Sequence, residues 1–124
     1  MREQALVLQD RLINFAVQVC RLSSDLPSTP AAQHIAKQML RCGTSPAPNY
    51  GEAQAAESRQ DFIHKMRICL KELRELHVWL RLLGRLEVLH SGALEGLEKE
   101  CNELVAIFTK SVLTATKRAR TPSV

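Results

Sequence analysis

The stretch SRQDFIHKMRICLKELRELHVWLRLLG, residues 58–84, decides the fold of this chain. Its apolar residues recur at alternating steps of four and three, at Phe62, Met66, Cys69, Leu73, Leu76, Leu80 and Leu83. This spacing places them on one face of an amphipathic helix. Ser58 is suited to cap the start of that helix, and Gly84 is suited to stop it. The stretch therefore predicts one long helix with a continuous apolar seam.

Two flanking segments repeat the same periodicity. The first, from about Glu3 to Leu22, steps by three and four through Ala5, Leu8, Leu12, Phe15, Val19 and Leu22. The last begins near Ser91 and lines one face with Leu94, Leu97, Cys101, Leu104, Phe108, Val112 and Ala115. No segment alternates with period two for long enough to form a strand. The chain is therefore expected to be all-α.

Residues 41–53, RCGTSPAPNYGEA, hold two prolines and two glycines, which ordinarily mark a loop. A helix that stopped at Arg41 would be too short to cover its partners. We therefore expect a second helix from about Pro30 to Ala56, kinked near residues 44–48. Small residues there would allow close approach of a neighbouring helix: Gly43, Ala47 and Gly51.

A polar trio lies within the same stretch, at Ser45, Asn49 and Glu52. Steps of four and three place the three side chains on one helical face. We expect them to satisfy backbone groups that the prolines free, which is a structural role rather than a catalytic one.

Four helices joined by short connections predict an antiparallel up-down-up-down four-helix bundle. The bundle is expected to be a single domain over residues 1–118, and residues 119–124 are expected to be a flexible basic tail. Three helices with an irregular second segment are the alternative.

Several classes of function lack their signatures. GxSxG, P-loop and GxGxxG motifs are absent from the sequence, so we expect no enzyme and no cofactor. The histidines are scattered, and the cysteines (Cys20, Cys42, Cys69 and Cys101) fall in different helical segments. This pattern indicates buried thiols in a reducing compartment and no metal site. With no apolar run of the roughly 20 residues that span a bilayer and no signal peptide, a cytoplasmic protein with no membrane association is expected.

Charge is unevenly placed along the chain, whose net charge is +4. Residues 59–85 hold seven basic residues against three acidic ones, whereas residues 87–103 hold five acidic residues and one lysine. Near-heptad spacing aligns Arg67, Lys71, Arg74, Arg81 and Arg85. Lys117, Arg118 and Arg120 add charge near the C-terminus. The five aligned residues are either a track for a phosphate backbone, to which the three C-terminal residues would add, or else a solvated face or a set of partners for acids on another helix or subunit.

Trp79 lies beside the apolar seam rather than in it. It either covers the edge of the bundle or anchors a subunit interface, where tryptophan is common. We favour the interface.

Residues 45–84 resemble the small four-helix bundle proteins encoded in intervening sequences of bacterial large-subunit ribosomal RNA genes. That family shows a Ser, an Asn four residues later and a Glu-Gly three residues after that. The matching residues are Ser45, Asn49 and Glu52, followed by Phe62-Ile63, Leu70-Lys71-Glu72 and Trp79-Leu80. The chain departs from the pattern at Glu52-Ala53, where Gly51 precedes the glutamate instead of following it.

The resemblance implies a four-helix bundle that assembles into a ring, expected to be a pentamer. Such a ring is similar to the accessory protein of diversity-generating retroelements, a basic pentameric barrel that binds nucleic acid and a reverse transcriptase. Two functions are therefore weighed. One is an oligomeric accessory protein that binds RNA or DNA through the basic residues, and the other is a scaffold whose basic residues contact the acidic fourth helix of a neighbouring subunit or a protein partner.

Overall fold

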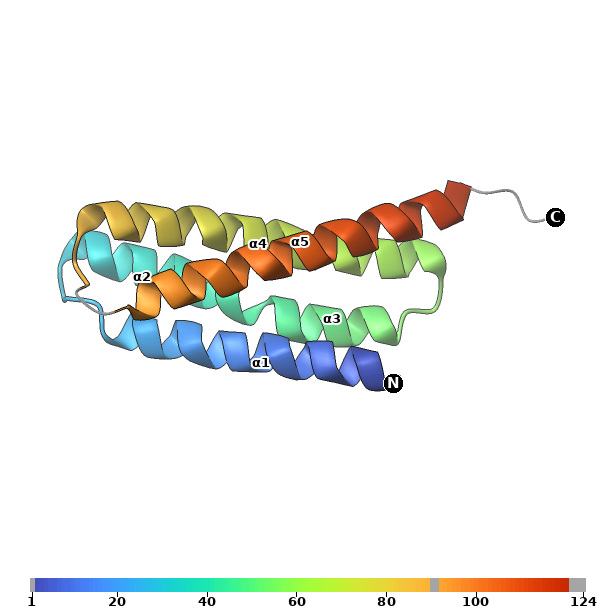
Figure 1. The fold of residues 1–124 in the computed structure, drawn as a ribbon, viewed down its shortest axis with the longest axis horizontal. Coiled ribbons are helices and arrows are strands. Elements are labelled where there is room, and N and C mark those ends of the chain that lie inside the picture. The colour runs from blue at the N-terminus through green and yellow to red at the C-terminus, as the bar shows by residue number, and fades with distance from the viewer. Residues whose placement is uncertain (1, 90–91, 121–124) are drawn as a thin grey trace.

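The computed structural model describes residues 2–89 and 92–120, and this part of the chain contains helices and no strands. The helices are α1 (Glu3–Ser24), α2 (Pro30–Thr44), α3 (Pro46–Gln54), α4 (Arg59–Leu86) and α5 (Ala93–Arg120). Because α3 follows α2 along the same line, the helices form four rods (Figure 1). The all-α prediction is confirmed.

Helix α4 packs against α5 on one side and against α2 and α3 on the other. Helix α1 contacts α2, α3 and α5 but not α4, so α1 and α4 lie diagonally across the bundle. The start of α1 and the end of α5 lie at one end of the molecule, and the end of α4 lies at the opposite end (Figure 1). The start of α4 therefore lies beside the last turns of α5.

The core follows the apolar seams. The largest fully buried side chains include Leu12 and Phe15 of α1, Leu73 of α4, and Leu104 and Phe108 of α5. Every residue of the seam predicted in residues 58–84 is buried except Phe62, which is partly buried against the core. Burial of these stripes against one another is the main source of stability in such a bundle.

Helix α4 begins as expected, because Ser58 Oγ accepts a hydrogen bond from the Asp61 amide at 3.0 Å. It ends two residues later than the predicted stop at Gly84. The helix continues to Leu86, and Glu87 closes it in the left-handed conformation with φ 53°. The Glu87 amide donates to the Gly84 carbonyl at 3.3 Å. Gly84 lies inside the helix and does not adopt the positive φ of a helix stop.

At the proline-rich stretch the predicted second helix is divided into α2 and α3 at Ser45. Ser45 itself keeps helical angles, φ −69° and ψ −39°, and its amide donates to the Arg41 carbonyl at 3.2 Å. Pro46 and Pro48 have no amide hydrogen, so the ladder of hydrogen bonds is interrupted at this point. Helix α3 ends at Gln54, two residues before the expected end.

Gly43 permits the close approach that its small size predicts. A Cβ built on Gly43 would lie 2.7 Å from Val19 Cγ1, so α1 touches the backbone of α2 at this point. A Cβ on Gly51 would meet only the end of the flexible Gln9 side chain. Of the two glycines in the stretch, only Gly43 is required by packing.

The described part of the chain holds no helix that is both long enough and apolar enough to cross a membrane.

Candidate nucleic-acid interface

Five basic side chains run along the outer face of α4, and we call them the basic stripe: Arg67, Lys71, Arg74, Arg81 and Arg85. All five are exposed. From Arg67 to Arg85 the helix rises by about 27 Å. Within residues 2–89 and 92–120, none of the five forms a salt bridge. Their positive charge therefore meets solvent without an acidic partner among the described residues.

Apolar side chains interrupt the basic stripe toward the end of α4. Val78 is 57% exposed, and Leu82 and Leu86 are also exposed. Arg81 and Arg85 lie among them, so this part of the surface is both basic and apolar. Such a mixture suits contact with another molecule better than simple solvation does.

The three C-terminal cations are exposed in the last turn of α5: Lys117, Arg118 and Arg120. That turn lies near the start of α4, whereas the end of α4, which carries Arg81 and Arg85, lies at the opposite end of the molecule (Figure 1). The three C-terminal cations are therefore separated along the bundle from Arg81 and Arg85. Helix α5 includes Ala119 and Arg120, two residues of the expected tail, and residues 121–124 lie outside the described residues.

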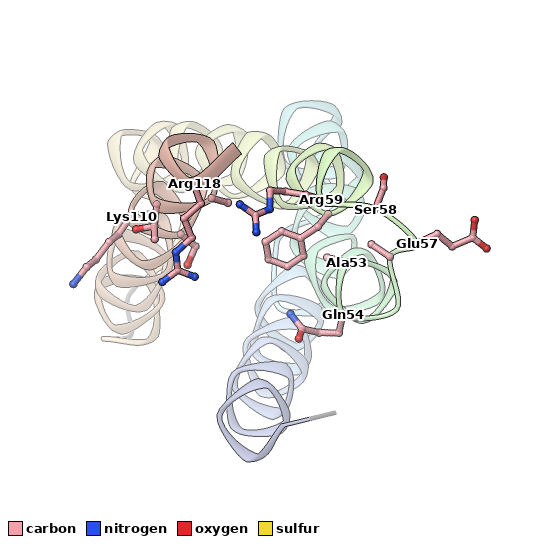
Figure 2. Close-up of a pocket in the computed structure, with 12 residues that line it drawn as sticks. Ala53, Gln54, Glu57, Ser58, Arg59, Lys110 and Arg118 are labelled. Atoms are coloured by element: carbon pink, nitrogen blue, oxygen red, sulfur yellow. The ribbon is translucent and has the colours of Figure 1, made fainter. Parts of the chain in front are cut away.

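A cavity of about 750 Å³ lies between the end of α3, the start of α4 and the last turns of α5 (Figure 2). Arg118 lines it together with Arg59 and Lys110, which were not among the predicted site residues. Lys110, Thr114 and Arg118 recur at helical spacing along α5, which is a signal present in the sequence. Their meeting with Arg59 depends on how α4 and α5 pack.

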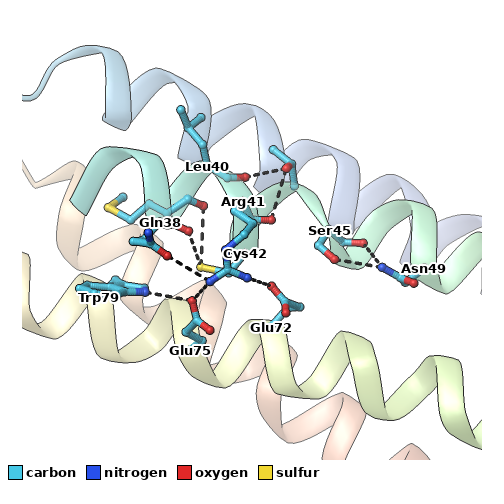
Figure 3. Close-up of polar contacts among 11 residues, drawn as sticks. Gln38, Leu40, Arg41, Cys42, Ser45, Asn49, Glu72, Glu75 and Trp79 are labelled. Atoms are coloured by element: carbon cyan, nitrogen blue, oxygen red, sulfur yellow. Dashed lines mark hydrogen bonds and ion pairs between the residues drawn. The ribbon is translucent and has the colours of Figure 1, made fainter. Parts of the chain in front are cut away.

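The polar trio splits into a Ser45–Asn49 pair, shown in Figure 3, and Glu52, which contacts another helix. Asn49 Nδ2 donates to the Ser45 carbonyl at 3.0 Å and to Ser45 Oγ at 2.9 Å. Glu52 instead accepts a hydrogen bond from Lys65 Nζ of α4 at 2.9 Å. Asn49 thus contacts the carbonyl of Ser45 itself, not a carbonyl whose donor a proline removes. The contacts hold the α2–α3 junction and tie α3 to α4.

Trp79 belongs to a polar cluster between α2 and α4 (Figure 3). Its ring is half-buried, lies edge-on to His34 with centroids 5.9 Å apart, and donates from Nε1 to Glu75 at 3.2 Å. Arg41 of α2 binds Glu72 at 2.9 Å and also binds Glu75. Trp79 therefore covers the α2–α4 edge within the chain, and its role in a subunit interface stays a prediction.

Arg11 of α1 contacts the acidic part of α5. Its Nε donates to Glu100 at 2.8 Å, and its Nη2 donates to Glu103 at 2.8 Å. The hydrogen bond from Arg11 holds the pKa of Glu100 below its ordinary value and raises the pKa of Arg11 itself. Part of the acidic segment is thus neutralised inside the chain.

Three of the cysteines are packing residues. Cys42, Cys69 and Cys101 are buried, and burial raises the pKa of each thiol to about 12. Cys69 Sγ donates to the Pro46 carbonyl at 3.5 Å, and Cys101 Sγ donates to the Leu73 carbonyl at 3.3 Å. Across the described residues, no group of three or more His, Cys, Asp or Glu side chains could hold a metal ion.

A known protein family and a solved structure are both similar to this chain. Residues 4–110 match the family model for the 23S rRNA-intervening sequence protein. A crystal structure of a protein of unknown function from the S23 ribosomal protein family of Bacteroides thetaiotaomicron is similar, with a TM-score of 0.78 and 34% sequence identity. The similarity covers 87% of this chain and 96% of that one. No curated protein sequence matches the chain.

Proposed function

The chain belongs to the family of 23S rRNA-intervening sequence proteins, and from this membership we propose that it is a non-enzymatic, oligomeric protein that binds nucleic acid through the basic stripe. The proposal includes an antiparallel up-down-up-down bundle, with its second helix kinked near residues 44–48, that assembles into a pentameric ring in the cytoplasm. The proposal extends to a reverse transcriptase as a protein partner, which rests on the resemblance in sequence to the accessory protein of diversity-generating retroelements.

The observation that carries nucleic-acid binding is the row of exposed, unpaired cations on α4. Arginine and lysine side chains at regular spacing can neutralise successive phosphates and release their counterions. Such contacts position a nucleic acid without reading its bases. The helix rise of about 27 Å from Arg67 to Arg85 suits several phosphates along one face of a duplex, which carries one charge per roughly 1.7 Å of axis.

Oligomerisation is supported by the apolar residues on the outer side of α1. Leu6 is 50% exposed, and Ile13 and Val17 are also exposed. Their helical positions lie opposite those of Leu12 and Phe15, which enter the core. An apolar row on a face that the bundle does not use favours contact with another copy of the chain.

The proposal is tested by measuring the mass of the protein in solution and its binding to generic RNA and DNA at about 50 and 200 mM salt. Five phosphate contacts predict a loss of affinity on the order of 10²–10³ over that range. Replacing Arg74 or Arg81 by Gln should each reduce the salt slope by about 1. Lys37→Gln, which removes the same charge from an exposed site on α2, is the matched control. Absence of binding at the lower salt concentration would overturn the proposal.

A second candidate is a scaffold in which the basic stripe contacts protein. It is favoured by the exposed Val78, Leu82 and Leu86 beside Arg81 and Arg85, and by the acidic residues at the start of α5. The double substitution Arg74→Glu and Arg81→Glu separates the two functions. Dissociation of the oligomer would support the scaffold, whereas an intact oligomer that no longer binds nucleic acid would support the first proposal.

A further inference from the structure

The cavity beside α5 combines a charged side with an apolar side. Its volume of about 750 Å³ lies within the range of small-molecule sites. The turn between α3 and α4 closes one side, and the last turns of α5 close another (Figure 2). The basic stripe lies on the outer face of α4, so the cavity is a distinct surface.

Two arginines supply the charged side. Arg59 extends from α4 toward α5, and Arg118 descends from α5 beside it (Figure 2). Lys110 and Glu57 also line the cavity, but they point away from this pair. Within the described chain, neither arginine nor Lys110 forms a salt bridge.

Two arginines that line the same cavity repel each other, and a bound anion removes that repulsion. The planar fork of a guanidinium group matches a phosphate in two simultaneous hydrogen bonds. A phosphate monoester carries a charge of roughly −1.5 to −2 at neutral pH, which two arginines balance. The charged side therefore fits a terminal phosphate better than a neutral ligand.

The remaining lining suits the rest of a nucleotide. Phe62 is half-buried at the cavity, with Ala53 and Ala115 beside it. An aromatic ring at such a position can stack on a base whatever its identity. Ser111 and Thr114 of α5 supply hydroxyl groups to the lining.

We propose that this cavity binds a nucleoside monophosphate group. Arg59 and Arg118 hold the phosphate, Phe62 stacks on the base, and the hydroxyls of Ser111 and Thr114 face the sugar. The source of the group is either a free nucleotide or the phosphorylated end of a nucleic-acid strand. The site goes beyond the proposed function and does not depend on the basic stripe.

The test is calorimetric titration of the full chain at low salt with adenosine 5′-monophosphate, adenosine and inorganic phosphate. The monophosphate should bind at least about tenfold more tightly than either fragment, since it alone engages both sides. Arg59→Gln combined with Arg118→Gln should weaken its binding at least about tenfold. The matched double variant, Lys37→Gln with Lys99→Gln, removes the same charge from exposed sites on α2 and α5, outside both the cavity and the basic stripe, and should bind the monophosphate unchanged.

Three results would overturn the site: no binding of the monophosphate, equal binding by the Arg59 and Arg118 double variant, or phosphate binding as tight as the monophosphate. Phe62→Leu checks the stacking, because it should weaken binding of the monophosphate and leave binding of inorganic phosphate unchanged. Because Arg59 and Arg118 are exposed, their substitution tests the site even where Phe62→Leu fails to fold.

A short oligonucleotide with a 5′-phosphate, compared with its 5′-hydroxyl form, distinguishes the two sources. A gain on phosphorylation that the Arg59 and Arg118 double variant abolishes assigns the site to strand ends. Tight monophosphate binding without that gain assigns it to free nucleotides. Salt-dependent binding of the 5′-hydroxyl strand that persists in the Arg59 and Arg118 double variant reports on basic residues outside the cavity, so failure of the cavity and failure of the proposed function are distinguishable.

Discussion

Gly43 lies directly against Val19: a Cβ on the glycine would approach Val19 Cγ1 to 2.7 Å. Val19 is fully buried and β-branched, so its side chain has no low-energy position to move into. Helix α2 can therefore pack on α1 at this depth only with glycine at position 43.

Replacing Gly43 with Ala should lower the free energy of unfolding. Overpacking of this kind costs roughly 1–3 kcal/mol, which exceeds the gain of about 1 kcal/mol in helix propensity. Gly51→Ala is the control, because only the end of Gln9 is in the way, and it should be neutral or stabilising. Urea unfolding of both variants gives the comparison, and equal stability of the two would contradict the close contact.

Replacing Glu87 with Gly should stabilise the protein. Glu87 holds φ 53°, and an L-residue in this conformation costs about 1 kcal/mol that glycine avoids. Glu87→Ala keeps the strain and removes the same carboxylate, so it should bring no gain. Thermal unfolding of the pair measures the difference, and a gain in the alanine variant would assign the effect to charge instead.

Thiol labelling of the native protein near pH 8 should modify Cys20 alone. Burial raises the pKa of Cys42, Cys69 and Cys101 to about 12, so almost no thiolate is present to react. Cys20 is only partly buried. Mass measurement should show one label on the native chain, four after denaturation, and none on native Cys20→Ser. Two or more labels before unfolding would refute this arrangement.

The acid sensitivity of the fold should depend on Glu100. Its pKa is lower in the folded chain than its ordinary value, chiefly because Arg11 donates to it. The stabilisation is therefore complete above the unfolded pKa of about 4.3, and it is lost as the pH falls through the lower folded pKa. The Arg11 side chain is 35% exposed, so the pair contributes about 0.5–1 kcal/mol at most.

Glu100→Gln should remove that contribution at pH 7 and make stability less dependent on pH between about 5 and 3. Glu103, whose side chain is 53% exposed, offers the comparison: Glu103→Gln should have the smaller effect. Unfolding free energies measured across this range decide the matter, and identical pH profiles for Glu100→Gln and the parent chain would argue against the pair.

The sequence predicted the fold most reliably where one periodic signal acts alone. The apolar residues of α4 recur with the period of the helix, so they lie on the face that packs against the core. The predicted end of α4 was wrong because Gly84 matches the usual signal for a helix stop. The structure instead ends the helix with Glu87 in a strained left-handed conformation, which no local sequence pattern indicates. Helical structure was predicted across residues 41–53, and α2 and α3 lie there, but sequence spacing did not predict their division at Ser45.

The candidate site was harder to predict, because it depends on which helix ends meet. Heptad spacing aligned the basic stripe, since all its members belong to one helix. Arg59 and Arg118 are far apart in sequence and come together only through the packing of α5 on α4. Trp79 likewise could not be placed from its position beside the seam, because its ring partner His34 belongs to another helix.

The break in hydrogen bonding at Ser45 has a consequence for local unfolding. Helix α3 has nine residues, too few to be stable in isolation, and is held by contacts such as the Cys69 thiol on Pro46 and Lys65 on Glu52. Because Pro46 and Pro48 interrupt the ladder, α3 can open without pulling apart the hydrogen bonds of α2. Its amides should therefore exchange with solvent as a separate cooperative unit. Since Ala53 and Gln54 line the cavity, a ligand there would protect α3 from exchange.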